Sequence, residues 1–179
     1  IFNWENEINK FTTGVKYHKH VGSNRNDKKI NFRKFNLTIT TYGLCRIDTE
    51  LLKETHFDVI VLDESQAIKN HTSQIAKSVK TLNAKNKFVM TGTPIENSTL
   101  DLYSQMDFVN PGMLGSAEYF KQTYAYQIDK NQDVNSALQL KKIIYPFILN
   151  RKKQQVAKDL PEKTEIILYC EMATDQRRV

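Results

Sequence analysis

The sequence predicts an α/β fold in which helices flank a parallel β-sheet. Short apolar or β-branched runs alternate along the chain with stretches of helical periodicity. The longest apolar run, Phe57–Leu62, is typical of a parallel strand that is covered on both faces. Polar residues follow two of these runs directly, namely Asp63, Glu64, Thr91 and Gly92. Ligands of parallel sheets bind at the carboxyl ends of the strands, so these residues predict a site.

The composition is that of a globular domain of ordinary size. The chain has 179 residues, of which 40% are hydrophobic and 26% charged. No apolar run has the length of a membrane span, so we expect no membrane association. Cys45 and Cys170 alone make neither a disulfide framework nor a zinc site, which predicts a reducing compartment. Because the sequence starts at Ile1 within a pattern, we expect it to belong to a longer protein.

The positive charge is concentrated near the amino-terminal end. The formal net charge is +6. Between positions 16 and 35 a single acid, Asp27, accompanies seven basic residues: Lys16, Lys19, Arg25, Lys28, Lys29, Arg33 and Lys34. A second basic run covers Arg151–Lys153. Such segments suit nucleic-acid phosphates, but they also occur as solvated faces, and charge alone favours the second interpretation.

The first third of the chain reads as a helix, two strands and a short helix. Trp4, Ile8 and Phe11 have helical spacing, which predicts a core-facing stripe. In order, the sequence then predicts a helix end at Gly14, a strand at 15–20, a loop or surface helix at 22–34, a strand at 37–41 and a short helix near 47–52. His18 and His20 share one face of the first strand, but no third metal ligand is visible.

The remaining elements alternate in the same way. The sequence predicts a strand at 57–62, a helix through 75–82, a strand at 87–91, a helix from about 98 to 109, helical stretches near 117–126 and 134–145, and a late strand at 166–169. Ser98 with Asp101 resembles a capping box at the start of the fourth helix. "NPG" at 110–112 ends that helix.

The adjacent carboxylates Asp63 and Glu64 suit phosphate-transfer chemistry. One carboxylate after a hydrophobic strand can hold Mg²⁺ through water, and its neighbour can orient or deprotonate an attacking water. An ordinary strand-to-loop turn explains a bare Asp-Glu pair equally well. The "TGTP" turn at 91–94 places two hydroxyl groups at the end of the next strand, within reach of a neighbouring loop.

Together these motifs resemble a known family. "DESQAIKN" followed by "MTGTPIEN" resembles the Swi/Snf-type DNA-dependent ATPases of helicase superfamily two. "NWENEINKF", "ITTYG" and "ILNRKKQQVAKDLPEKTEIILYCEM" resemble further stretches of that family and occur in its order. The Ser-Gln pair after the carboxylates is familiar among bacterial members.

The resemblance implies a fold and an activity. Members have two RecA-like lobes that clamp ATP and Mg²⁺ and move along double-stranded DNA. Residues 1–112 resemble part of lobe one, 113–150 its helical protrusion, and 151–179 the linker and first strand towards lobe two. The implied location in a bacterium is the cytoplasm, at the nucleoid. In a eukaryote it is the nucleus.

The resemblance also implies residue roles. Asp63 and Glu64 match the pair that binds Mg²⁺ and activates water, and Ser65 and Gln66 complete that motif, with Gln66 in the catalytic set. The remaining assignments are a coupling motif at Thr91, Gly92 and Thr93, and DNA contacts at Thr40, Thr41, Tyr42, Lys28, Lys29, Arg33 and Lys34. We expect Gln66 to lie within hydrogen-bonding distance of Thr91 or Thr93, because their loops leave adjacent strands.

Two features depart from the family pattern. Asn150 replaces the first Arg of an Arg pair, and no G-x-x-x-x-G-K-[ST] phosphate loop occurs in the sequence. The second lobe is also missing, and without it and the phosphate loop we expect the isolated chain to hydrolyse no ATP. The strand at 87–91 lacks a neighbouring strand, so we also expect the isolated chain to self-associate. The alternatives are a non-catalytic nucleic-acid-binding module and an unrelated Mg²⁺-dependent hydrolase, which would leave "TGTPIEN" unexplained.

Overall fold

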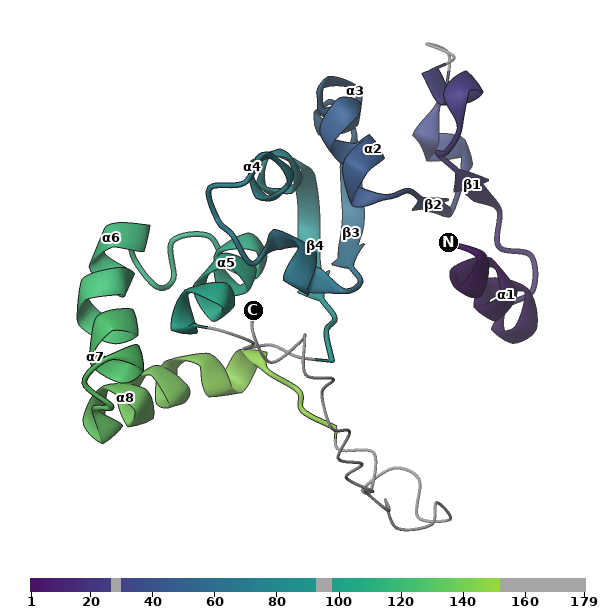
Figure 1. Cartoon of the computed structure of the whole chain (residues 1–179). Coiled ribbons are helices and arrows are strands. Elements are labelled where there is room, and N and C mark those ends of the chain that lie inside the picture. The colour runs from purple at the N-terminus through teal and green to yellow at the C-terminus, as the bar shows by residue number, and fades with distance from the viewer. Residues whose placement is uncertain (27–29, 93–97, 152–179) are drawn as a thin grey trace, which may run out of the picture. The chain divides into compact units, whose positions relative to one another are not determined.

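The computed structural model describes residues 1–26, 30–92 and 98–151, and it confirms the α/β fold. The chain divides into two compact units, Ile1–Lys141 and Lys142–Val179. The first unit holds both pairs of parallel strands and nearly all the helices (Figure 1). The described part of the second unit holds the end of α8 and the 3₁₀ turn η5 (Tyr145–Phe147).

Within the described residues the predicted alternation of strands and helices is present in chain order, and the predicted late strand at 166–169 lies outside them. The elements are α1 (Phe2–Phe11), β1 (Tyr17–Lys19), η1 (Ser23–Asn26), η2 (Phe32–Lys34), β2 (Leu37–Ile39), α2 (Tyr42–Ile47), α3 (Thr49–Lys53), β3 (His56–Leu62), η3 (Ser65–Ile68), α4 (Gln74–Lys80), β4 (Asn83–Val89), α5 (Thr99–Val109), α6 (Ala117–Phe120), the π-helical turn η4 (Lys121–Ala125), α7 (Tyr126–Asp129) and α8 (Val134–Ile144). No helix in the described ranges is long and apolar enough to cross a membrane.

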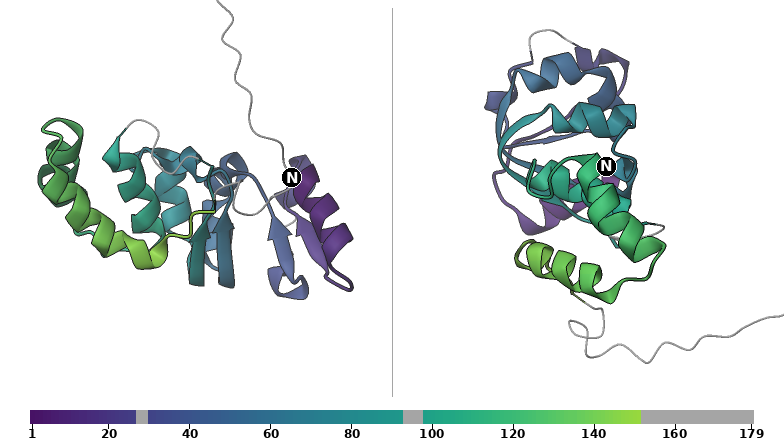
Figure 2. Two further views of the ribbon diagram at one scale, coloured as in Figure 1. Left: turned by 90° about the horizontal axis from the view of Figure 1, so that it is seen from below. Right: turned by 90° about the vertical axis from the view of Figure 1, so that its left-hand side faces the viewer.

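Both strand pairs are parallel. β1 pairs with β2, with His18 opposite Thr38, and β3 pairs with β4, with Leu62 opposite Val89. Helix α4 lies in the crossover connection from β3 to β4, and the turns η1 and η2 lie in the connection from β1 to β2 (Figure 2). Because β3 and β4 end side by side, the residues that follow Leu62 and Val89 lie at one edge.

The core lies between one face of β3–β4 and the helices. Its buried members come from both sides of that interface: Phe32, Cys45, Leu52, Leu62, Ile68, Ala76, Val79, Leu82 and Phe108. Ile60 and Val89 pack against this cluster from the sheet. Burying one large aliphatic or aromatic side chain contributes about 1.5–3 kcal/mol, so this layer holds the ends of β3 and β4 in place.

The prediction that β3 is covered on both faces is wrong for the part of the chain that the structure describes. Val61 on β3 is 49% exposed and its partner Phe88 on β4 is 55% exposed. Val59 and Met90 extend this apolar strip. An apolar run shows that a strand is hydrophobic on both faces but does not show whether a second layer of helices covers it.

β4 also begins earlier than predicted, at Asn83 rather than Lys87. Its polar first half pairs with the start of β3, with Asn83 opposite His56 and Asn86 opposite Val59. The Asn83 side chain donates a hydrogen bond to the Lys53 carbonyl at 2.8 Å. Backbone pairing and such side-chain contacts form a strand here without an apolar pattern.

Two helix predictions need correction. Of the predicted stripe on α1 only Ile8 is buried, whereas Trp4 is 40% and Phe11 69% exposed. The Ser98 side chain makes no capping hydrogen bond at the start of α5. Instead, the Asp129 carboxylate of α7 accepts hydrogen bonds from the Thr99 amide and hydroxyl. The start of α5 is thus capped by a distant helix, which local sequence cannot reveal.

Candidate functional site

Asp63 and Glu64 lie exposed at the carboxyl end of β3, beside the end of β4. The backbone fixes this neighbourhood, because Met90 N donates to Leu62 O at 2.8 Å and Ser65 N donates to Met90 O at 3.0 Å. The prediction that both motifs meet at one sheet edge is therefore confirmed.

Glu64 has a strained backbone. Its φ of 50° and ψ of 54° are left-handed, although it is not a glycine. This conformation costs an L-residue roughly 1–2 kcal/mol, and such outliers gather at functional sites. The turn leaves the Glu64 carboxylate within 2.8 Å of the Gln66 side-chain amide, which donates to its Oε2.

Gln66 bridges the two loops. Its Nε2 binds Glu64, while its Oε1 accepts a hydrogen bond from Thr91 Oγ1 at 3.1 Å. The expected proximity of Gln66 to Thr91 is thus confirmed. Gly92 is exposed beside it, and Thr93 lies outside the described residues. Ser65 is fully buried, and its hydroxyl has no hydrogen-bond partner in the described part of the chain.

Two hydrogen bonds to Asp63 come from segments far away in the sequence. Trp4 Nε1 donates to Asp63 Oδ2 at 2.8 Å, and the Tyr42 hydroxyl donates to the Asp63 carbonyl oxygen at 2.8 Å. Burial, with the nearby Asp63 charge, raises the pKa of Tyr42 well above its usual range, so the hydroxyl remains a donor. Sequence reasoning missed both contacts, because helical spacing assigned Trp4 to the core and the motif resemblance assigned Tyr42 to DNA.

The Thr40–Tyr42 turn uses its side chains within the protein. Thr40 Oγ1 donates to the His20 carbonyl at 3.0 Å. Thr41 Oγ1 accepts from Leu44 N at 3.2 Å and caps α2. The side-chain hydroxyls therefore hold the shape of the turn, and a DNA contact would fall to its backbone.

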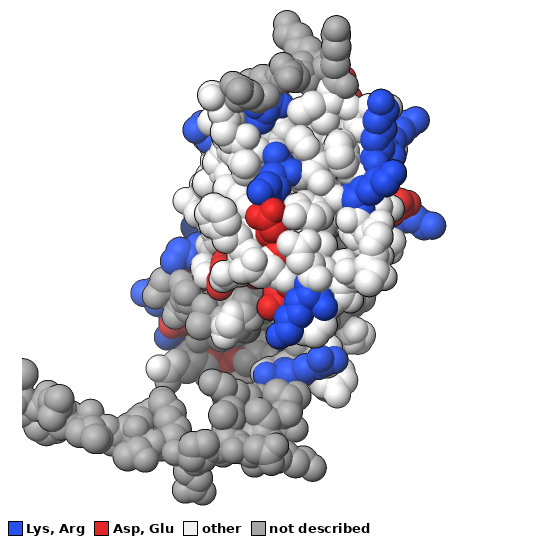
Figure 3. Space-filling model, turned by 90° about the vertical axis from the view of Figure 1, so that its right-hand side faces the viewer, with Lys and Arg blue, Asp and Glu red and all other residues white. Residues whose placement is uncertain are grey.

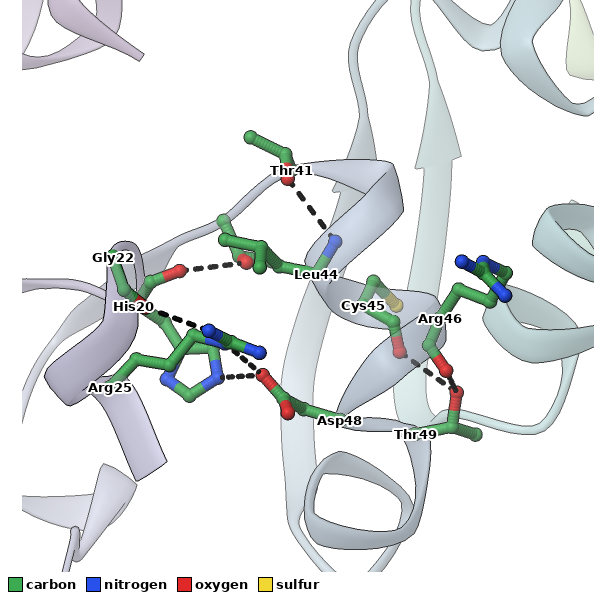
Figure 4. A network of polar contacts seen from close by, with 10 residues as sticks. His20, Gly22, Arg25, Thr41, Leu44, Cys45, Arg46, Asp48 and Thr49 are labelled. Atoms are coloured by element: carbon green, nitrogen blue, oxygen red, sulfur yellow. Dashed lines mark hydrogen bonds and ion pairs between the residues drawn. The ribbon is translucent and has the colours of Figure 1, made fainter. Parts of the chain in front are cut away.

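A buried polar network holds η1 against α2 and α3 (Figure 4). Asp48 Oδ2 contacts His20 Nε2 at 2.9 Å and accepts from Arg25 Nε at 2.7 Å, and Arg25 Nη1 donates to the Gly22 carbonyl at 2.7 Å. Burial opposes ionisation of Asp48, but the hydrogen bonds from Arg25 and His20 outweigh it, and the pKa of Asp48 is lowered. His20 thus serves an ion-pair network.

The basic segment is only partly available to a ligand. Lys19 pairs with Glu5 at 2.9 Å, and Arg25 pairs with Asp48. Arg33 and Lys34 are exposed at η2, and Lys28 and Lys29 lie outside the described residues. On the face shown in Figure 3, Lys and Arg form separate groups, and acidic side chains lie beside several of them.

The carboxylates fit Mg²⁺ better than a metal with many protein ligands. No group of three or more His, Cys, Asp and Glu side chains able to hold a metal occurs among the described residues. Mg²⁺ is usually held by one or two carboxylates together with water and substrate phosphates. Asp63, a carboxylate exposed at a strand end, has the chemistry that such a ligand requires.

Comparison with known proteins agrees with this geometry. A family model described as SNF2-related domain matches residues 1–179. TATA-binding protein-associated factor mot1 of Schizosaccharomyces pombe is 31% identical over 98% of the chain, and the chromatin-remodeling ATPase INO80 of Candida albicans is 32% identical over 100% of it. The chain spans only 10% and 14% of these relatives.

A solved structure gives the fold. The SWI2/SNF2 ATPase core of Sulfolobus solfataricus in complex with dsDNA superimposes with a TM-score of 0.81 and 40% identity, covering 99% of this chain and 37% of that one. The parallel sheet flanked by helices is thus of the RecA-like kind expected from the sequence. With the family model spanning all of its residues, the chain belongs to the SNF2-related domain family.

Proposed function

We propose that this chain supplies the hydrolytic and coupling part of lobe one in an ATP-dependent translocase that acts on double-stranded DNA. In this proposal residues 1–112 are part of the RecA-like lobe, 113–150 its helical protrusion and 151–179 the linker towards a second lobe. The chain spans 10% to 37% of the relatives described above, and it contains no phosphate-loop motif. The longer protein would supply that loop and the second lobe. It would be located with its DNA, in the cytoplasm of a bacterium or the nucleus of a eukaryote.

The observation that carries this proposal is the hydrogen-bonded chain from Glu64 through Gln66 to Thr91. It connects the candidate water-activating carboxylate to the loop after the neighbouring strand. A structural turn has no need for a strained carboxylate next to such a bridge.

Each residue of the candidate site would have its own role in ATP hydrolysis. Asp63 would hold Mg²⁺ through water, and Mg²⁺ would neutralise charge on the ATP phosphates. Glu64 would position or deprotonate the attacking water, and Gln66 would fix the Glu64 side chain. Thr91, Gly92 and Thr93 would couple the ATP state of this site to the residues that contact DNA.

The DNA contacts would come from two neighbouring stretches. The Thr40–Tyr42 turn lies one hydrogen bond from Asp63, through the Tyr42 hydroxyl. Arg33 and Lys34 are exposed on the segment that Arg25 and Asp48 anchor, and Lys28 and Lys29 belong to the same segment. These side chains would contact phosphates without reading base sequence.

Phosphate release with and without double-stranded DNA tests the proposal. The longer protein should hydrolyse ATP faster when DNA is present, and the 179-residue chain alone should not hydrolyse it, since it lacks a phosphate loop. Rapid release by the chain alone would refute this division of the site. DNA binding without hydrolysis by the longer protein would favour the alternative, a non-catalytic nucleic-acid-binding module.

A further inference from the structure

We propose that Trp4 is a positioning residue for the Asp63 carboxylate, which its indole N–H holds in place from α1. The inference rests on the proposed role of Asp63 in holding Mg²⁺. The contact joins Trp4 Nε1 to Asp63 Oδ2 at 2.8 Å, across 59 positions of sequence. The Trp4 side chain thus links α1 to the end of β3.

The hydrogen bonds of Asp63 fix both of its oxygens. Oδ1 accepts from the Glu64 amide at 3.0 Å, and Oδ2 accepts from Trp4. An ionised carboxylate has about four acceptor positions, so about two remain for other donors, such as water on a metal ion. The indole N–H can only donate, so it supports the ionised carboxylate in one orientation and does not compete with it for a cation.

The helix that carries Trp4 is itself anchored. On α1, Glu5 Oε1 accepts from the Tyr17 hydroxyl at 2.8 Å and from Lys19 Nζ at 2.9 Å, which ties the helix to β1. Hydrogen bonding to Lys19 and Tyr17 lowers the pKa of Glu5, so this tie persists at neutral pH. A movement of β1 or α1 would therefore reach Asp63 through Trp4.

The exposure of Trp4 supports a polar role. Trp4 is 40% exposed as a residue, whereas Ile8 on the same helix is buried. An indole has an apolar body and a polar N–H edge, and in Trp4 the polar edge meets the Asp63 carboxylate. Phe11, also on α1 and exposed, has no such group and offers a matched control.

The indole proton gives a direct readout, because the chain contains a single tryptophan. One indole N–H peak should appear in a ¹H–¹⁵N correlation spectrum of the 179-residue chain. We expect Asp63→Ala to move that peak towards the position of a solvent-exposed indole, and Asp58→Ala, on the exposed part of β3, to leave it in place. An indole peak unmoved by Asp63→Ala, with the remaining amide peaks showing a folded chain, would overturn the proposal.

The functional consequence is measured in the longer protein. Trp4→Phe keeps an aromatic ring but removes the donor. We expect it to raise the Mg²⁺ concentration for half-maximal ATP hydrolysis about threefold to tenfold, with kcat at saturating Mg²⁺ retained, since an exposed hydrogen bond contributes less than a buried one. Phe11→Leu should leave this concentration unchanged.

ATP hydrolysis by the wild-type protein and the Mg²⁺ requirement of Trp4→Phe together separate a failure of the Trp4 role from a failure of the proposed function. If the wild-type protein hydrolyses ATP and Trp4→Phe has an unchanged Mg²⁺ requirement, Trp4 is not a positioning residue. A loss of thermal stability without a change in the Mg²⁺ requirement would show a structural role and would also overturn the proposal. If the wild-type protein hydrolyses no ATP, the proposed function itself fails, while the indole spectrum still shows whether the hydrogen bond exists.

Discussion

At the residue scale, the environment of Asp63 and Glu64 is built from the neighbouring strand β4 and from a helix far away in the sequence, α1. Asp63, Glu64 and Gln66 stand in a short motif, and their bonding follows from neighbouring strands. The hydrogen bond from Trp4 to Asp63 joins α1 to the end of β3. Helical spacing indicated only that Trp4 is a large apolar residue on one face of a helix. An indole has an apolar body and a polar edge, and sequence spacing does not show which of the two decides its position.

The buried residue Asp48 gives a prediction about stability. Asp48→Asn removes the charge that His20 and Arg25 share, and we expect a loss of about 2 kcal/mol in the free energy of unfolding at neutral pH. Chemical denaturation measures it, with Asp58→Asn on the exposed part of β3 as the control. Equal stability of Asp48→Asn and wild type would show that the network contributes nothing.

The Asp48→Asn variant also tests how the free energy of unfolding depends on pH. The pKa of Asp48 is lower in the folded chain than its ordinary value, so the folded state favours the ionised form. Its stabilisation is fully present above the unfolded pKa and is lost as the pH falls through the folded value. The difference between wild type and Asp48→Asn should therefore shrink on acidification below the ordinary Asp range, and a constant difference would contradict this assignment.

At the element scale, periodicity predicted where helices and strands occur better than what covers them. Of the two structures predicted for 22–34, a loop or a surface helix, the described residues favour the loop: they contain only the short turns η1 and η2, with Phe32 buried and Arg25 bonded to Asp48. The start of β4 and the cap of α5 depend on β3 and on Asp129. Such elements are completed by distant partners, which a sequence window does not contain.

The basic segment should be the main determinant of DNA affinity within this chain. We expect weak binding without sequence preference. Changing Lys28, Lys29, Arg33 and Lys34 to Gln should weaken it and reduce the slope of log affinity against log salt by roughly 0.7–0.9 for each phosphate that is no longer neutralised. Neutralising the exposed Lys77, Lys121, Lys130 and Lys141 changes the net charge equally and should have a smaller effect. Fluorescence anisotropy across a salt series measures the DNA affinity of both sets of variants. Equal losses of affinity in the two sets would show that the basic segment is a solvated face.

At the scale of the whole molecule, the exposed strip on β3 and β4 predicts self-association of the isolated chain. Val59, Val61, Phe88 and Met90 form an apolar strip, and among the described residues β4 pairs with β3 alone. Sedimentation at low micromolar concentration should detect oligomers, and Val61→Lys with Phe88→Lys should reduce them, because charges on the strip oppose its burial. A wild-type chain that sediments as a monomer would contradict this expectation.

The turnover of Glu64→Gln in the longer protein shows directly whether Glu64 acts on the attacking water. With ATP and double-stranded DNA present, we expect ATP binding to be largely preserved and kcat to fall about 100-fold or more, because the variant loses the group that positions or deprotonates water. Glu54→Gln, an exposed change at the end of α3, should retain wild-type turnover. Unchanged kcat in Glu64→Gln would show that Glu64 is structural and would contradict the account.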